Sequence, residues 1–169
     1  MAVRPIKIFP DGVLSSPTQP FTQFGPSLKS LVEDLFDTLY ASPGVGLAAP
    51  QIGVLRRVSV VDVSKRPLKK GLESSNQGPL VLINPVMVRG EGRQVPREGC
   101  LSVPEFLANV TRFHWVQIKA QDVQGEWRVL EAMGFEALAF QHEIDHLEGK
   151  LFLDRVTNIK TDVFRRKMF

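Results

Sequence analysis

Residues 132–149 read AMGFEALAFQHEIDHLEG, and this stretch predicts the central element of the fold. Its apolar side chains recur at helical spacing, so we expect a helix that begins at residue 132 or 133 and stops at Gly149. The apolar positions cover two opposite sides of that helix, which is typical of a helix packed in the middle of a domain. His142 and His146 continue one of the apolar sides, so both rings are expected to point inward.

The two histidines enclose the H-E-x-x-H pattern His142-Glu143-Ile144-Asp145-His146. Residues four apart on a helix lie one above the other, so both imidazoles can reach one metal ion. Glu143 lies about 100° around the helix axis from His142. A metal lowers the pKa of a bound water, and a carboxylate placed there can take its proton. The alternative is a pair of histidines satisfied by neighbouring groups, although an unpaired imidazole on an apolar side is costly.

A catalytic metal commonly has three protein ligands and one open position. Two acidic residues, Glu148 and Asp154, lie downstream of the histidines, and the only cysteine, Cys100, lies upstream. A lone cysteine is more often a small buried apolar residue than a ligand. The residue pattern alone therefore leaves the third ligand open. The remaining histidine, His114, lies in a strand-like run and is expected to be structural.

The rest of the chain predicts further elements around this helix. A second helix is expected to start at Pro26-Ser27 and to end near Ser42-Pro43, because leucine and valine recur there at helical spacing. Alternating and β-branched runs predict strands at residues 57–63, 80–83, 86–89, 115–120 and 127–130, the last two joined as a hairpin. Segment 64–79 is expected to be the least ordered loop. We therefore predict an α+β fold of mostly antiparallel sheets packed around a central metal-binding helix.

Composition narrows the class of protein. The chain has 169 residues, a length that fits one domain over residues 1–169. Its net charge is +3 and its pI is about 9.2, but the basic residues are not interleaved with aromatic ones, which disfavours DNA binding. A short basic segment closes the chain at residues 157–169. One cysteine cannot form an internal disulfide, and no apolar run could span a bilayer. We expect a cytoplasmic protein, or an organellar one whose transit peptide has been removed.

Three stretches together resemble the signature motifs of the peptide deformylases. They are GVGLAAPQ at residues 44–51, EGCLS at residues 98–102 and QHEIDHLEG at residues 141–149. The three occur in the family's order and at roughly its separations, and the resemblance extends from about Ile6 to Asp154. It implies a metal-dependent hydrolase that removes the N-formyl group from the N-terminal formyl-methionine of nascent bacterial or organellar polypeptides and releases formate.

The resemblance also implies roles for individual residues. Cys100, His142 and His146 would bind one divalent metal ion, typically Fe(II), with nickel, cobalt or zinc able to take its place. Glu143 would shuttle the proton. The side-chain amide of Gln51 and the backbone N–H of Leu101 would hold the oxyanion. The peptide would add as a strand and place its methionine in an apolar pocket, and these contacts fall to Val45, Gly46, Gly99, Phe135, Leu138 and Ala139.

Two other functions are compatible with the residues alone. A small metalloendopeptidase would use the same H-E-x-x-H pattern to cut internal peptide bonds. A non-catalytic, metal-stabilised binding module would need a closed site with four ligands, and the sequence offers no fourth ligand. The expected partners are N-formyl-methionyl peptides, with ribosome contact through the basic C-terminus and neither DNA nor a membrane.

Overall fold

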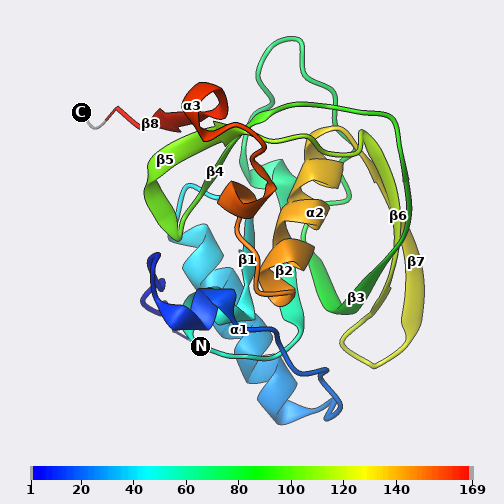
Figure 1. Cartoon of the computed structure of the whole chain (residues 1–169). Coiled ribbons are helices and arrows are strands. Elements are labelled where there is room, and N and C mark those ends of the chain that lie inside the picture. The colour runs from blue at the N-terminus through cyan, green and yellow to red at the C-terminus, as the bar shows by residue number, and fades with distance from the viewer. Residues whose placement is uncertain (1, 168–169) are drawn as a thin grey trace.

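The computed structural model describes residues 2–167 and shows two antiparallel sheets around one helix (Figure 1). The helices in this range are α1 Pro26–Tyr40, α2 Phe135–Leu147 and α3 Ile159–Asp162, and the 3-10 turns are η1 Gly12–Ser15, η2 Ala49–Ile52, η3 Val63–Lys65 and η4 Phe152–Arg155. The strands are β1 Gly46–Ala48, β2 Val58–Val61, β3 Leu80–Glu91, β4 Arg97–Cys100, β5 Val103–Asn109, β6 Trp115–Gln121, β7 Trp127–Met133 and β8 Val163–Arg165.

The strands form two separate sheets. The larger sheet has the order β1-β2-β3-β6-β7 and the smaller one the order β4-β5-β8, and every named pairing is antiparallel. In Figure 1 the helix α2 lies between the β6–β7 side of the larger sheet and the smaller sheet. This arrangement confirms the predicted α+β class with a central helix.

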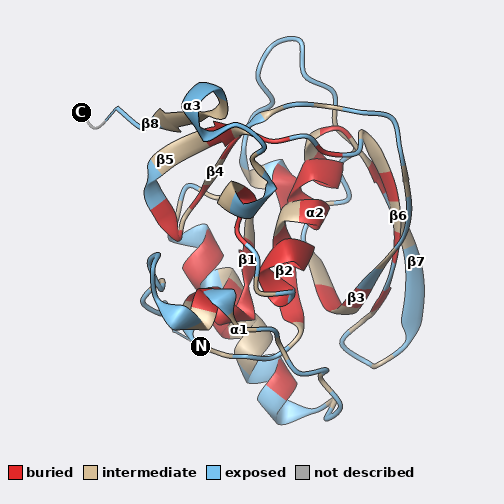
Figure 2. Ribbon diagram, in the orientation of Figure 1, coloured by how far each residue is buried: buried red, intermediate tan, exposed pale blue. Residues whose placement is uncertain are grey.

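The helix α2 is buried along most of its length (Figure 2). Phe140 and Ile144 join the core beneath the larger sheet, where they pack with residues of β2, β3 and β6. The helix α1 is amphipathic: Leu28, Leu35 and Leu39 are buried against β1 and β2, and polar side chains alternate with them on the outer side. Pro26 occupies its first turn, where a missing N–H costs nothing.

Several boundaries differ from the sequence prediction; the strand expected at 57–63, for example, is β2 over Val58–Val61, and residue 63 belongs to η3. Residues 132 and 133 belong to β7, because they pair with Val116 and Trp115 of β6, and α2 begins only at Phe135. Gly134 separates the two elements with a φ of 63°, a conformation that suits glycine. The strands expected at 80–83 and 86–89 are one strand, β3, whose pairing with β6 shifts between Ile83 and Val86. A bulge of this kind bends a strand without ending it.

The smaller sheet was not predicted from the sequence. The strand β4 and the turn that leads into β5 contain the motif around Cys100, and glycine, proline and charged residues there and in β5 hide the alternating pattern. Within the basic C-terminal segment, the structure places α3 and then β8, which pairs with β5 through Leu107↔Phe164. The predicted loop 64–79 has no helix or strand beyond η3.

Lys65 connects the end of α1 to the start of β1. Its ammonium group donates hydrogen bonds to the carbonyls of Leu39 at 2.7 Å, Ser42 at 2.6 Å and Gly44 at 2.7 Å. The first of these carbonyls lies in the last turn of the helix, where acceptors lack partners and a cation is favourable. Lys65 thereby holds the chain that enters β1.

Within the described range, no helix has both the length and the apolar character needed to cross a bilayer.

Candidate metal centre and substrate pocket

Three side chains from two distant segments converge at the centre of the molecule. His146 Nε2 lies 3.3 Å from Cys100 Sγ and 3.2 Å from His142 Nε2. All three ligand atoms lie within 4.8 Å of one another, and they form the only such group of histidine, cysteine or acidic residues in the described part of the chain. The strand β4 supplies the sulfur, and successive turns of α2 supply the two rings.

The acids that the sequence offered as alternative ligands are engaged elsewhere. Glu148 pairs with Arg57 at 2.9 Å, and Asp154 accepts a hydrogen bond from the Leu151 N–H at 2.8 Å. His114 lies outside the cluster, with its Nε2 atom 3.5 Å from the Glu73 carboxylate. The structure therefore favours Cys100 as the third ligand.

Glu98 orients one of the two rings. Its Oε1 atom lies 2.7 Å from His142 Nδ1. Because a carboxylate accepts hydrogen bonds, this contact assigns the proton to Nδ1 and leaves the Nε2 lone pair facing Cys100 and His146. Glu98 and Cys100 are two residues apart on β4, so both point to the same face of the strand.

Glu98 is in turn held by a buried arginine. Arg112 donates from Nε and Nη2 to the two oxygens of Glu98, at 2.7 and 2.9 Å, and from Nη1 to Asp145 at 2.7 Å. Asp145 also accepts two hydrogen bonds from Arg155. Charged hydrogen bonds hold the pKa of Glu98 and that of Asp145 below their ordinary values, although burial opposes this. Both carboxylates therefore stay ionised inside the protein.

Glu143 lies beside the cluster, on the side facing β1. It is almost fully buried, and its Oε1 atom has no hydrogen-bond partner among the described residues. Burial raises its pKa, and the neighbouring histidines only partly oppose the rise. A carboxylate with a raised pKa and an unused oxygen is suited to accept and return a proton.

Gly46 makes room for that carboxylate. A Cβ atom at residue 46 would lie 2.5 Å from Glu143 Oε2, closer than real Cβ contacts. The resemblance implies a contact between Gly46 and the peptide backbone, which stays a prediction, and in the structure the missing side chain of Gly46 faces Glu143. A methyl group at residue 46 would therefore force the Glu143 carboxylate out of its position.

Gln51 and Leu101 lie beside Cys100. The Gln51 side chain is fixed at both ends: Oε1 accepts from the Ala48 N–H at 3.0 Å, and Nε2 donates to Ser102 Oγ at 3.1 Å and to Cys100 Sγ at 3.6 Å. Its donor group therefore faces the metal cluster. The Leu101 side chain packs against Gly44, where a Cβ would lie 2.9 Å from Leu101 Cδ1.

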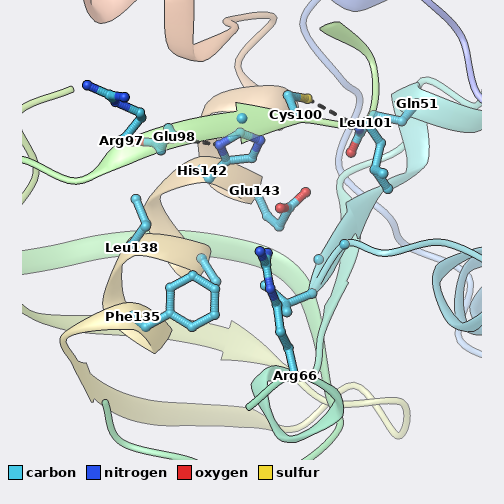
Figure 3. A pocket seen from close by; sticks show the side chains of 15 residues that line it. Gln51, Arg66, Arg97, Glu98, Cys100, Leu101, Phe135, Leu138, His142 and Glu143 are labelled. Carbon is cyan, nitrogen blue, oxygen red and sulfur yellow. Dashed lines mark hydrogen bonds and ion pairs between the residues drawn. The ribbon is translucent and has the colours of Figure 1, made fainter. Parts of the chain in front are cut away.

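A pocket of about 140 Å³ opens beside the cluster (Figure 3). Apolar side chains of α2 form one wall, and the segments around β1 and β4 form the others. All the site residues predicted from the sequence line this pocket, with the exception of His146. They are Val45, Gly46, Gln51, Gly99, Cys100, Leu101, Phe135, Leu138, Ala139, His142 and Glu143. Their individual roles stay predictions. Four further residues line the same pocket, Gly44, Arg66, Arg97 and Glu98.

The donor atoms fit a divalent metal ion. A tetrahedral ion with metal–nitrogen bonds of about 2.0–2.1 Å holds two ligating nitrogens roughly 3.3 Å apart, close to the 3.2 Å between the two Nε2 atoms. Burial opposes ionisation of the Cys100 thiol, but His146 and His142 outweigh it and hold its pKa well below the ordinary value. A thiolate and two imidazoles suit several first-row metals.

Sequence reasoning missed three residues around this centre. The role of Glu98 could have been predicted, because a residue two positions away from a metal ligand on a strand lies on the same face of the strand as the ligand. Asp145 lies inside the H-E-x-x-H pattern but was assigned no role. Arg112 carried no local signal, since its function depends on residues 14 and 33 positions away in the sequence.

The fold and the candidate metal centre together define a class of protein, the α+β metal-dependent hydrolases with a Cys-His-His metal site. The model of the polypeptide deformylase family matches residues 3–162. A peptide deformylase from Acidobacterium capsulatum is 42% identical and aligns over 99% of this chain and 95% of its own. The crystal structure of a peptide deformylase from Legionella pneumophila has a TM-score of 0.84 and 40% identity, covering 94% of this chain and 89% of its own.

A third relative adds a bound peptide. The class I type b peptide deformylase from Acinetobacter baumannii, bound to Met-Ala-Ser, has a TM-score of 0.85 at 31% identity and covers 92% of this chain and 99% of its own. The present chain belongs to the polypeptide deformylase family. Enzymes of this family remove the formyl group from nascent chains.

We predict that Gly46→Ala reduces turnover by roughly 100-fold, because the methyl group displaces the Glu143 carboxylate. Formate release would be measured together with metal content, which is expected to stay at the wild-type level. Gly12→Ala is the matched control, since a Cβ there meets nothing within 4 Å. Wild-type turnover in Gly46→Ala would contradict the crowding between residues 46 and 143.

Proposed function

We propose that this chain removes the N-formyl group from the N-terminal formyl-methionine of nascent polypeptides and releases formate. The observation that carries the proposal is the position of the Cys100, His142 and His146 cluster at one end of a pocket with apolar walls. A methionine side chain fits such walls, and its formylated nitrogen would then lie near the cluster. The Met-Ala-Ser complex of the Acinetobacter relative supports this class of ligand.

The proposed chemistry begins with Cys100, His142 and His146 holding one divalent ion. Such an ion, when bound, supplies a Lewis acid that polarises a carbonyl and makes a water molecule more acidic. Glu143 is placed to take the proton of the attacking water, because it lines the pocket and its Oε1 atom has no hydrogen-bond partner among the described residues. The raised pKa of Glu143 favours uptake of this proton, which the protonated carboxyl group can then donate to the leaving amine.

Negative charge develops on the formyl oxygen as water attacks. We assign its stabilisation to the Gln51 side-chain amide and the Leu101 backbone N–H. Ser102 and the Ala48 N–H hold the Gln51 amide in place before the substrate arrives. A donor fixed in advance stabilises the transition state without a reorganisation cost.

The substrate backbone is proposed to add as a strand beside the pocket. Each of β1 and β4 has one strand partner among the described residues, β2 and β5 respectively, so each presents a second edge. Val45, Gly46 and Gly99 lie at these edges and line the pocket, and Phe135, Leu138 and Ala139 supply its apolar wall. Pairing through the backbone provides affinity with little dependence on sequence.

Glu143→Gln tests the reaction. Formate release from formyl-Met-Ala-Ser is expected to fall at least ~100-fold, because the amide cannot take a proton. Glu126→Gln, at an exposed turn position, is the control and should turn over like the wild type. Near-normal turnover in Glu143→Gln would remove the assigned role. A wild-type enzyme that cut internal peptide bonds and ignored formyl-methionyl peptides would overturn the function itself.

Fe(II) is the proposed native metal, with nickel, cobalt or zinc as substitutes that the same donors can bind. Cys100→Ala is expected to lose most of its metal on dialysis, because only the two imidazoles remain. Elemental analysis of anaerobically purified protein measures both points, with Glu143→Gln as a variant that keeps all three ligands. Full metal content in Cys100→Ala would overturn the thiolate ligand, and zinc in place of iron would overturn the choice of metal.

A contact with the ribosome is proposed for the basic C-terminal segment. Lys160, Arg165 and Lys167 are exposed on α3, on β8 and beyond it. Such charges can attract ribosomal RNA phosphates where nascent chains emerge, in the bacterial cytoplasm or in an organelle. Replacing all three residues by glutamine should weaken co-sedimentation with ribosomes and leave the turnover of short peptides unchanged. Unaltered co-sedimentation would refute this contact.

A further inference from the structure

Three arginine side chains lie at the mouth of the pocket. Arg66 follows η3 and Arg97 begins β4, and both line the pocket (Figure 3). Arg166 follows β8 and lies over Gly99, where its Nη2 atom is 2.5 Å from the position that a Cβ would take. All three residues are exposed, and none has a carboxylate within ion-pair distance among residues 2–167. We call this set the arginine mouth.

The C-terminal strand holds two of these arginines in place. The Arg97 guanidinium lies 4.0 Å from the centre of the Phe164 ring, in a cation–π contact. The Arg166 N–H donates to the Glu105 carbonyl at 2.7 Å, which extends the pairing between β8 and β5. The smaller sheet therefore presents both guanidinium groups beside the β4 edge. Arg66 approaches from the opposite side, and Figure 3 shows its side chain extending toward the space between Phe135 and Glu143.

The carboxylates of the pocket do not neutralise the positive charge of the arginine mouth. Glu98 is buried and is committed to Arg112 and His142. Glu143 is buried beside the metal cluster. The pocket therefore combines apolar walls inside with positive charge at its opening that no carboxylate of residues 2–167 pairs with. Charges of one sign around a concave site attract ligands of the opposite sign.

An extended peptide would carry its following residues past this mouth. Each residue of an extended chain advances by about 3.3–3.6 Å, so the second and third residues lie just outside a pocket that holds the first. Guanidinium groups bind carboxylates with paired hydrogen bonds. We propose that the arginine mouth selects peptides that carry an aspartate or glutamate at the second or third position. This inference rests on the proposed function, since it places the first residue in the pocket.

A series of peptides tests the selection. Formyl-Met-X-Ser amide and formyl-Met-Ala-X amide, with X as Glu, Gln or Lys, vary one charge and carry no C-terminal carboxylate. The expected order of kcat/KM is Glu, then Gln, then Lys, in at least one of the two positions. Each exposed ion pair contributes roughly two- to fivefold. The preference should shrink at high salt, because exposed charges are screened.

Single variants assign the preference to the mouth. Arg66→Gln, Arg97→Gln and Arg166→Gln should each reduce the ratio of kcat/KM between the Glu and Gln peptides. Arg93→Gln is the matched control: Arg93 is also exposed, but it does not line the pocket, so the ratio should stay unchanged. A purely structural defect would lower the rates for all peptides and would leave this ratio unaltered.

Two results would overturn the inference. Equal kcat/KM for the Glu, Gln and Lys peptides at both positions would show that the arginine mouth does not discriminate between peptides by their charge. Equal slowing of all peptides in the arginine variants would show that the guanidinium groups bind the peptide backbone or support the fold. Calorimetric binding of the unformylated Met-X-Ser amides gives the same comparison without turnover. Absence of formate release from every peptide would therefore count against the proposed function alone.

Discussion

The site depends on one buried ion pair, between Arg112 and Glu98. Taking these charges out of water is expensive, and it is tolerated only because each meets an opposite charge with good hydrogen bonds. Arg112 also contacts Asp145, and Arg155 completes the balance with a second positive charge. Because Glu98 belongs to β4 and Asp145 to α2, the same arginine joins the smaller sheet to the central helix. The orientation of the His142 ring follows from this junction.

Two simple periodicities then assemble the metal centre. The two-residue repeat of β4 places Glu98 and Cys100 on one face, and the four-residue spacing on α2 places His142 and His146 on one side. When the strand lies against the helix, a sulfur, two ring nitrogens and the residue that orients one ring come together. The same close packing explains Gly46, since the carboxylate of Glu143 occupies the space of a side chain there.

The pocket has a buried inner part and a solvent-exposed opening, and water screens electrostatic interactions differently in the two. Inside, burial raises the pKa of Glu143 and strengthens the polar contacts around Gln51, because little water screens them. At the opening, Arg66 and Arg97 are exposed, so their influence on a ligand is smaller and depends on salt. The proposed chemistry thus belongs to the inner residues, whereas the proposed discrimination among peptides belongs to the residues at the opening.

The sequence by itself determined the central helix, the inward direction of His142 and His146, and the family, because helical spacing and short motifs are local properties of the chain. It left the third ligand open until the motifs were compared as a set, and it placed the start of α2 too early because pairing with β6 competes with helical spacing. Tertiary structure alone decided that Arg112 holds Glu98 and that β8 returns beside β5. Those contacts join residues far apart in the chain, so their existence depends on how the sheets pack and not on any local pattern of residues.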